Sequence, residues 1–102
     1  MGYSKKHRLI KTEWPKFGEC LSPPQPPADE FTARLDAVGA AMERFKLTHL
    51  VVYGDREHFA NLAWLTGFDP RFEEALLIIS RRRNPLLVVG NECKGYLTVS
   101  PL

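Results

Sequence analysis

Reactive side-chain types are densest between residues 55 and 77 of this sequence, in the stretch DREHFANLAWLTGFDPRFEEALL. Asp55 and His58 are three residues apart, a spacing that can place two side chains on one helix face and permit both to bind a metal ion. An aspartate that caps a helix and a histidine at the surface explain the same spacing without a ligand. The sequence contains neither an H-E-x-x-H motif nor a cluster of cysteines and histidines. We therefore expect no metal site in this chain.

Acid–base, nucleophilic and phosphate-binding chemistry also lack their usual patterns. Glu73 and Glu74 are adjacent at the start of an expected strand, where alternation sends them to opposite faces, so they cannot act as a facing pair. No G-x-S-x-G segment occurs, Cys20 has no base near it in sequence, and the glycines do not form a phosphate-binding loop. The arginines at 81–83 are typical of a solvated turn. We expect no catalytic residue, cofactor or nucleic-acid partner for this chain.

Arg71 and Phe72, which follow the Gly67–Phe68 turn, are the best candidates for contact with a ligand. The guanidinium group is a planar fork that fits a carboxylate, and binding groups tend to lie on loops held between rigid strands. The structural alternative is a surface ion pair between Arg71 and Glu73 or Glu74.

Composition and length favour one globular domain with its own core. The chain has 102 residues, 44% of them hydrophobic, and a formal net charge of +2 that does not demand a polyanionic partner. No apolar run approaches the roughly 18 residues of a membrane span, and no apolar signal core follows the basic N-terminus. We expect a cytoplasmic protein in which Cys20 and Cys93 are free thiols.

Two regions with different patterns divide the chain. Residues 1–28 end in SPPQPPA and form an expected extended, basic and proline-rich arm, which Trp14 and Phe17 could pin to a neighbouring surface. Its basic residues are Lys5, Lys6, Arg8, Lys11 and Lys16. Residues 29–102 form the expected α/β domain.

The domain should contain three helical segments and three strands. Apolar residues at spacings of four and three predict a helix from a capping Asp29 to about residue 45. Asp55 is expected to cap a second helix that ends near Leu62. The expected strands are 48–53, 74–80 and 84–90, the last two paired antiparallel through RRRN, and a third helix or turn begins at residue 91. This order predicts a mixed β-sheet flanked by helices.

Four segments resemble the N-terminal domain of the creatinase, prolidase and aminopeptidase P family: RLDAVGAAM, THLVVYG, NLAWLTGFDPRFEEALLII and PLLVVG. In that family an Arg-Leu pair opens the first helix, here Arg34 and Leu35, and the helix contains a methionine, here Met42. An Asn then precedes a YLTGF-like segment, here Asn61 and WLTGF. The resemblance covers about residues 30–95 and implies a ribonuclease H-like arrangement. Family N-terminal domains normally continue for several more elements, so we expect a truncated version of it.

The resemblance implies a domain without chemistry of its own. The family's reaction belongs to a separate C-terminal domain with a dinuclear divalent metal centre, which is absent here. The N-terminal domain shapes the substrate entrance and contributes to an oligomer. The residues that fall in the entrance region are Trp64, Phe68, Arg71 and Phe72, and those of the structural motif are Asp55, Asn61, Thr66 and Gly67.

The resemblance therefore predicts a non-catalytic domain of a creatinase- or Xaa-Pro aminopeptidase-like protein. We expect a fragment or truncated relative, a homodimer, and a peptide substrate only through the absent catalytic domain, while activity of the parent protein stays open. The alternative is a stand-alone module in which the Arg71 loop and the arm bind a protein partner or a small carboxylate.

Overall fold

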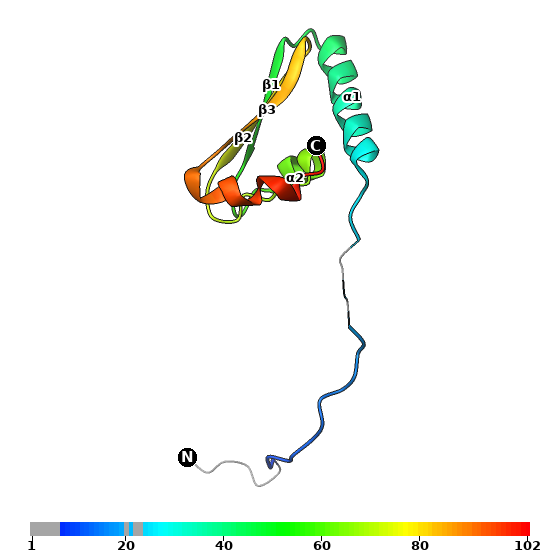
Figure 1. Ribbon diagram of the computed structural model, residues 1–102, viewed down its shortest axis with the longest axis vertical. Helices are drawn as coiled ribbons and strands as arrows, with labels where there is room; N and C mark the ends of the chain where they lie inside the picture. The colour runs from blue at the N-terminus through cyan, green and yellow to red at the C-terminus, as the bar shows by residue number, and fades with distance from the viewer. Residues whose placement is uncertain (1–6, 20, 22–23) are drawn as a thin grey trace.

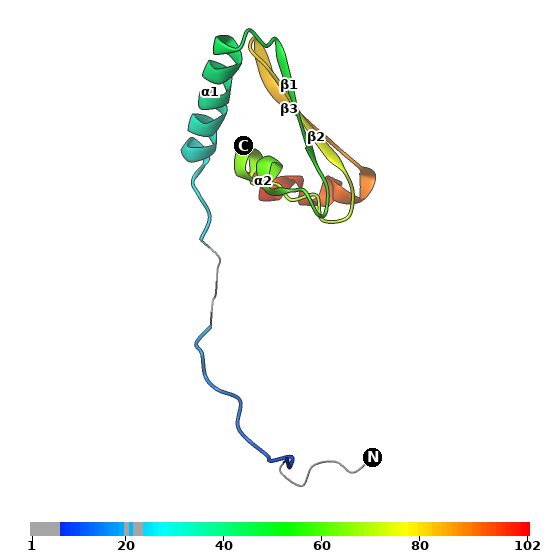
Figure 2. The same ribbon diagram turned by 180° about the vertical axis from the view of Figure 1, so that it is seen from behind.

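The protein consists of a folded body and a long N-terminal arm, seen from two sides in Figures 1 and 2. The computed structural model describes residues 7–19, 21 and 24–102. Lys5, Lys6 and Cys20, which the sequence analysis assigned to the basic arm and to the free thiols, lie outside the described residues. Within the described residues, no helix is long and apolar enough to cross a lipid bilayer.

Helix α1, Ala28–Arg44, follows the apolar pattern of its sequence. Phe31 and Met42 are buried, and Leu35 and Val38 lie between them on the same helix face and pack at the edge of the core. The expected Asp29 cap is wrong: Pro27 is the N-cap residue, and the Asp29 carboxylate accepts a hydrogen bond from the Glu30 N–H, 3.0 Å away. Proline suits this position because its fixed φ leads the chain into the helix from an extended segment.

The three strands form one antiparallel sheet in the order β1-β2-β3. Strand β1 is His49–Gly54, β2 is Ala75–Ser80 and β3 is Arg83–Val89. The expected hairpin between the last two strands is confirmed. The expected mixed sheet is wrong for the described residues, since β1 also pairs antiparallel with β2, with Val52 opposite Leu77. The helices and this sheet place the protein in the α/β class in the broad sense of mixed helix and strand.

The two faces of the sheet differ in burial. Side chains alternate along β2, with Ala75, Leu77 and Ile79 buried against the helices. They form the core together with Met42, Leu62, Leu65, Phe68 and Cys93. The opposite, outer face is also apolar and consists of Val51, Tyr53, Leu76, Ile78, Leu86 and Val88. Four of its six side chains are exposed by more than 40%, so no layer of the described chain covers it.

Two short helical segments complete the body on the inner side of the sheet (Figure 1). Helix α2 is Ala60–Thr66, not the helix expected from Asp55 to about Leu62, because residues 55–58 form a turn instead. The 3-10 helix η1, Asn91–Val99, occupies the place of the expected third helix or turn and contains Cys93, a buried free thiol. Gly67 ends α2 with a φ of 71°, a left-handed conformation that side chains with a Cβ rarely adopt.

The arm leads away from the body without packing on it (Figures 1 and 2). Residues 7–19 and 24–27 contain no helix or strand, and the molecule measures 70 Å along its longest axis. Leu9, Ile10, Trp14 and Phe17 are each exposed by two thirds or more. In the described structure neither aromatic residue pins the arm to the body.

Candidate functional site

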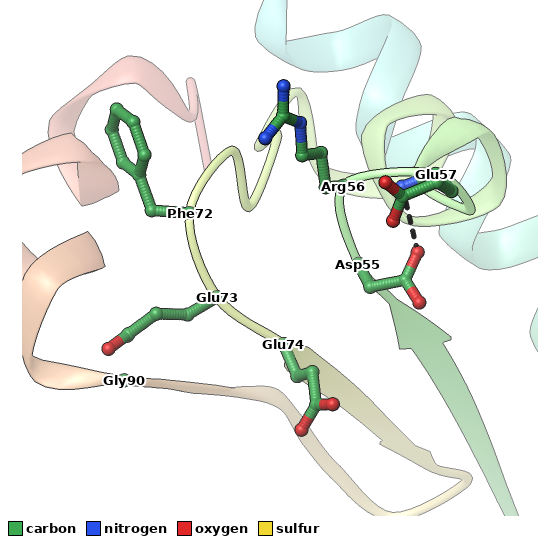
Figure 3. A pocket seen from close by; sticks show the side chains of 7 residues that line it. All are labelled: Asp55, Arg56, Glu57, Phe72, Glu73, Glu74 and Gly90. Atoms are coloured by element: carbon green, nitrogen blue, oxygen red, sulfur yellow. Dashed lines mark hydrogen bonds between the residues drawn. The ribbon is translucent and has the colours of Figure 1, made fainter.

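An acidic pocket of about 540 Å³ lies where β1 and β3 end and β2 begins. Its lining residues are Asp55, Arg56, Glu57, Phe72, Glu73, Glu74 and Gly90. The lining therefore contains four carboxylates and one guanidinium group. Figure 3 shows that these side chains come from two loops and from the end of β3, segments that are far apart in the sequence. The excess of negative charge makes the pocket attractive to a cation.

Asp55 shapes the loop that follows β1 by capping a turn rather than a helix. Its Oδ1 accepts hydrogen bonds from the backbone N–H groups of Glu57 and His58, at 2.9 and 2.6 Å. Its Oδ2 accepts a hydrogen bond from the Tyr53 hydroxyl at 3.0 Å. The His58 ring Nδ1 lies 3.1 Å from Oδ1. The spacing of Asp55 and His58 thus reflects a turn with its own hydrogen bonds, as aspartate commonly forms.

These contacts change the acidity of the two groups that meet at the end of β1. Desolvation of the phenol, the hydrogen bond to Asp55 and the negative charges of Asp55 and Glu74 together raise the pKa of Tyr53 to about 12. Desolvation opposes ionisation of Asp55, but hydrogen bonds from His58, Tyr53 and Glu57 outweigh it and lower the pKa of that carboxyl below its ordinary value. Asp55 is consequently ionised and Tyr53 protonated at neutral pH.

Glu73 has an incomplete set of partners. Its Oε2 is buried and accepts no hydrogen bond, although an unpaired carboxylate oxygen away from water is costly. The side chain points to Gly90 at the end of β3 (Figure 3), where a Cβ on residue 90 would overlap the carboxylate. Glycine is therefore required at 90 for Glu73 to hold this position. A donor or cation in the pocket would satisfy the free oxygen.

An aromatic pair borders the acidic pocket on the side of η1. The Phe72 and Tyr96 ring centroids are 5.9 Å apart, with the planes tilted by 43°. Phe72 is nevertheless 62% exposed, so one side of its ring is available for contact with an apolar group. Carboxylates and an aromatic surface together suit a ligand with a positive charge beside an apolar part.

The four expected entrance residues do not form one rim. Phe68 is completely buried in the core and lines no surface of the described chain. Trp64 lies on α2 under the Arg34 guanidinium, whose carbon is 4.8 Å from the ring centroid, and it borders a groove along β1. Phe72 borders the acidic pocket.

Arg71 extends from the loop before β2 and lines neither the acidic pocket nor that groove. Its Nε is 3.7 Å from Oδ2 of Asp69, in place of the expected pairing with Glu73 or Glu74. The side chain is 74% exposed, and solvent weakens an ion pair of this kind. Of the ligand candidates, Phe72 is the one that the structure brings to a pocket.

Thr66 and Gly67, two of the structural-motif residues, form the C-terminal end of α2. The Thr66 hydroxyl donates to the Leu62 carbonyl at 2.7 Å and accepts from the Phe68 N–H at 3.0 Å. Gly67 supplies the left-handed turn between them. Asn61, another residue of the expected structural motif, lies in the first turn of α2 and borders the groove along β1.

Sequence reasoning missed the acidic pocket, because Glu57, Glu73, Glu74 and Gly90 meet only in the folded chain. Among the residues that the structure describes, no three His, Cys, Asp or Glu side chains gather as ligands of a metal ion. Comparison of the chain with protein-family models, curated proteins and solved structures finds no match.

Proposed function

We propose that this chain is the non-catalytic N-terminal domain of a creatinase- or Xaa-Pro aminopeptidase-like protein, in which the acidic pocket forms a wall of the peptide entrance. The order helix, strand, helix and hairpin supports the proposal, as does the WLTGF segment that ends α2. A ribonuclease H-like arrangement, a cytoplasmic location and a homo-oligomer are parts of the same proposal. In this proposal, the dinuclear metal centre belongs to a C-terminal domain outside this chain.

The acidic pocket is the observation on which the proposal rests. A peptide with a free amino terminus presents an ammonium group beside its first side chain, and the pocket offers four carboxylates beside the exposed Phe72 ring. The buried, unpartnered oxygen of Glu73 lacks the hydrogen bond that an ammonium group can donate. A carboxylate ligand at Arg71 is less favourable, because Arg71 lines neither the acidic pocket nor the groove along β1 and already lies near Asp69.

Binding of a short Xaa-Pro peptide to the isotope-labelled chain tests the entrance role. We expect chemical-shift changes at residues 55–57 and 72–74, and weaker binding of an N-acetylated peptide because it lacks the ammonium charge. Glu57→Gln and Glu74→Gln should each weaken binding. Asp36→Asn removes the same charge from an exposed position on α1 and is the matched control.

Three results would contradict the proposal. Equal binding of the free and acetylated peptides, or shifts that avoid the acidic pocket, would refute peptide recognition there. Hydrolysis of an Xaa-Pro dipeptide by the 102-residue chain with added Mn²⁺ would refute a non-catalytic role. The hydrolysis assay needs a preparation free of contaminating peptidase, for which an immunodepleted sample of the same chain is the control.

A further inference from the structure

The outer edge of β1 lacks a partner strand in the described structure. In the sheet order β1-β2-β3, β1 pairs with β2 alone, so one edge of HLVVYG leaves backbone N–H and C=O groups free. This segment contains no proline or lysine, residues that commonly protect an edge. The other edge strand, β3, contains Arg83 and Pro85, and proline offers no N–H for pairing. β1 is therefore the better template for an added strand.

A groove follows the free edge of β1 on the helix side of the sheet. It has a volume of about 430 Å³, and its walls include Val38 of α1 together with Trp64 and Leu65 of α2. Leu50 and Val52 of β1 complete the apolar surface. An added strand would place every second side chain into this groove and the others on the outer face of the sheet. The occupant must then be extended and must direct an apolar side chain into the middle of this groove.

The arm contains a segment of matching length and pattern. Residues 8–13, RLIKTE, are six residues long, as β1 is, and contain neither proline nor glycine. Leu9 and Ile10 are exposed by 104% and 67%, so neither is engaged with the body. Antiparallel pairing with Ile10 opposite Val52 directs Ile10 into the apolar groove, and Arg8 and Thr12 lie on the same side of the strand, opposite Gly54 and Leu50. The same register leaves Leu9, Lys11 and Glu13 on the outer face of the sheet, with Leu9 opposite Tyr53.

Charges at the ends of the two segments select the antiparallel direction. β1 ends beside the carboxylates of Asp55 and Glu57, and it begins beside the arginines at 81–83, which share a pocket with His49. In the antiparallel register Arg8 approaches the acidic end and Glu13 approaches the basic end. Parallel pairing would bring like charges together at both ends, which is unfavourable.

We propose that residues 8–13 of one chain add as a fourth strand to the β1 edge of a second copy. The arm leaves its own body through residues 24–27, an extended segment with three prolines, and it continues away from the sheet (Figures 1 and 2). Proline-rich segments are stiff over several residues, so the arm is presented to another molecule rather than returned to its own edge. Two arms and two edges form a closed, two-fold symmetric dimer.

Disulfide trapping between differently labelled chains tests the exchange. In the proposed register Lys11 lies opposite Val51, a pair close enough for a disulfide. In a Cys20→Ser background, mixing Lys11→Cys chains with Val51→Cys chains should give a covalent heterodimer. Val88→Cys is the matched control, because Val88 is a similarly exposed valine of the outer face on the far strand β3 and should not cross-link.

Two further measurements distinguish exchange between chains from pairing of the arm with its own body. A chain with both Lys11→Cys and Val51→Cys should form linked dimers, and an intrachain disulfide in a monomer would overturn the exchange. Sedimentation should show a dimer for the full chain and a monomer after deletion of residues 1–13. Identical oligomeric states for these two chains would overturn it as well.

Charge reversal tests the register independently of cysteines. Arg8→Glu should weaken the dimer roughly tenfold, since each of two interfaces loses an attraction and gains a repulsion. Lys16→Glu makes the same change beyond the paired segment and should leave the dimer nearly unchanged. Equal effects of the two substitutions would refute the antiparallel register. These readouts do not depend on peptide binding at the acidic pocket, so peptide recognition there and the strand exchange can fail separately.

Discussion

Thr66 is the buried polar side chain on which the end of α2 depends. Its hydroxyl donates to Leu62 and accepts from Phe68, at a position only 4% exposed. Thr66→Val keeps the shape and removes both hydrogen bonds, which should destabilise the protein by about 1–3 kcal/mol. Thr66→Ser retains the hydroxyl and is the control. Equal stability of the two variants in chemical denaturation would show that the hydrogen bonds contribute nothing.

The shifted pKa values of Tyr53 and Asp55 predict a loss of stability at both ends of the pH range. The pKa of Tyr53, about 12 in the folded state, exceeds its ordinary 10.0, so the stability it contributes is present below pH 10 and is lost as the pH rises toward 12. The pKa of Asp55 is lowered, so its contribution is present above pH 3.8 and is lost as the pH falls through the folded-state pKa.

A spectrophotometric titration of tyrosine ionisation tests the raised pKa of Tyr53 at alkaline pH. The difference between the titrations of the wild type and of Tyr53→Phe should show a phenol that ionises near pH 12. Asp55→Asn should move that midpoint downward, because it removes a negative charge beside the phenol. A midpoint at 10 in the wild-type chain would contradict the hydrogen bond between the two side chains.

At the scale of an element, the segment from Thr66 to Phe72 contains two phenylalanines that differ in burial, although their sequence surroundings are similar. Phe68 is fully buried and Phe72 is 62% exposed. Phe68→Ala should cost about 3–5 kcal/mol of stability because it opens a cavity. Phe72→Ala should change stability little but weaken peptide binding at the acidic pocket. Thermal unfolding and peptide titration of both variants check this division, and similar losses of stability would disprove it.

The elements that were predictable are those fixed by local patterns. Apolar residues at helical spacing located α1, and two β-rich runs around a polar turn located the β2–β3 hairpin. Asp55 misled the prediction of α2, since an aspartate that bonds the N–H groups two and three residues ahead can cap a turn as well as a helix. The pairing of β1 with β2 and the meeting of Glu73 with Gly90 depend on distant contacts, which no local pattern encodes.

At the scale of the whole molecule, the arm should make thermal stability depend on protein concentration. If residues 8–13 pair with a second copy, dissociation accompanies unfolding, and the Tm of the full chain should rise with concentration. Deletion of residues 1–13 should remove this dependence while leaving the circular dichroism of the body unchanged, because the arm side chains do not pack on it. A Tm independent of concentration in the full chain would contradict the association.

The position of β2 between two antiparallel neighbours also ranks the strands by how readily their amides exchange with solvent. β2 is hydrogen-bonded on both sides, and its residues Ala75, Leu77 and Ile79 are buried, so its amides are engaged in one ladder or the other and should exchange slowly. β1 and β3 can each fray alone from one side. Addition of an arm would convert β1 from a fraying edge into a second interior strand, so association would extend the slow-exchanging core across half of the enlarged sheet.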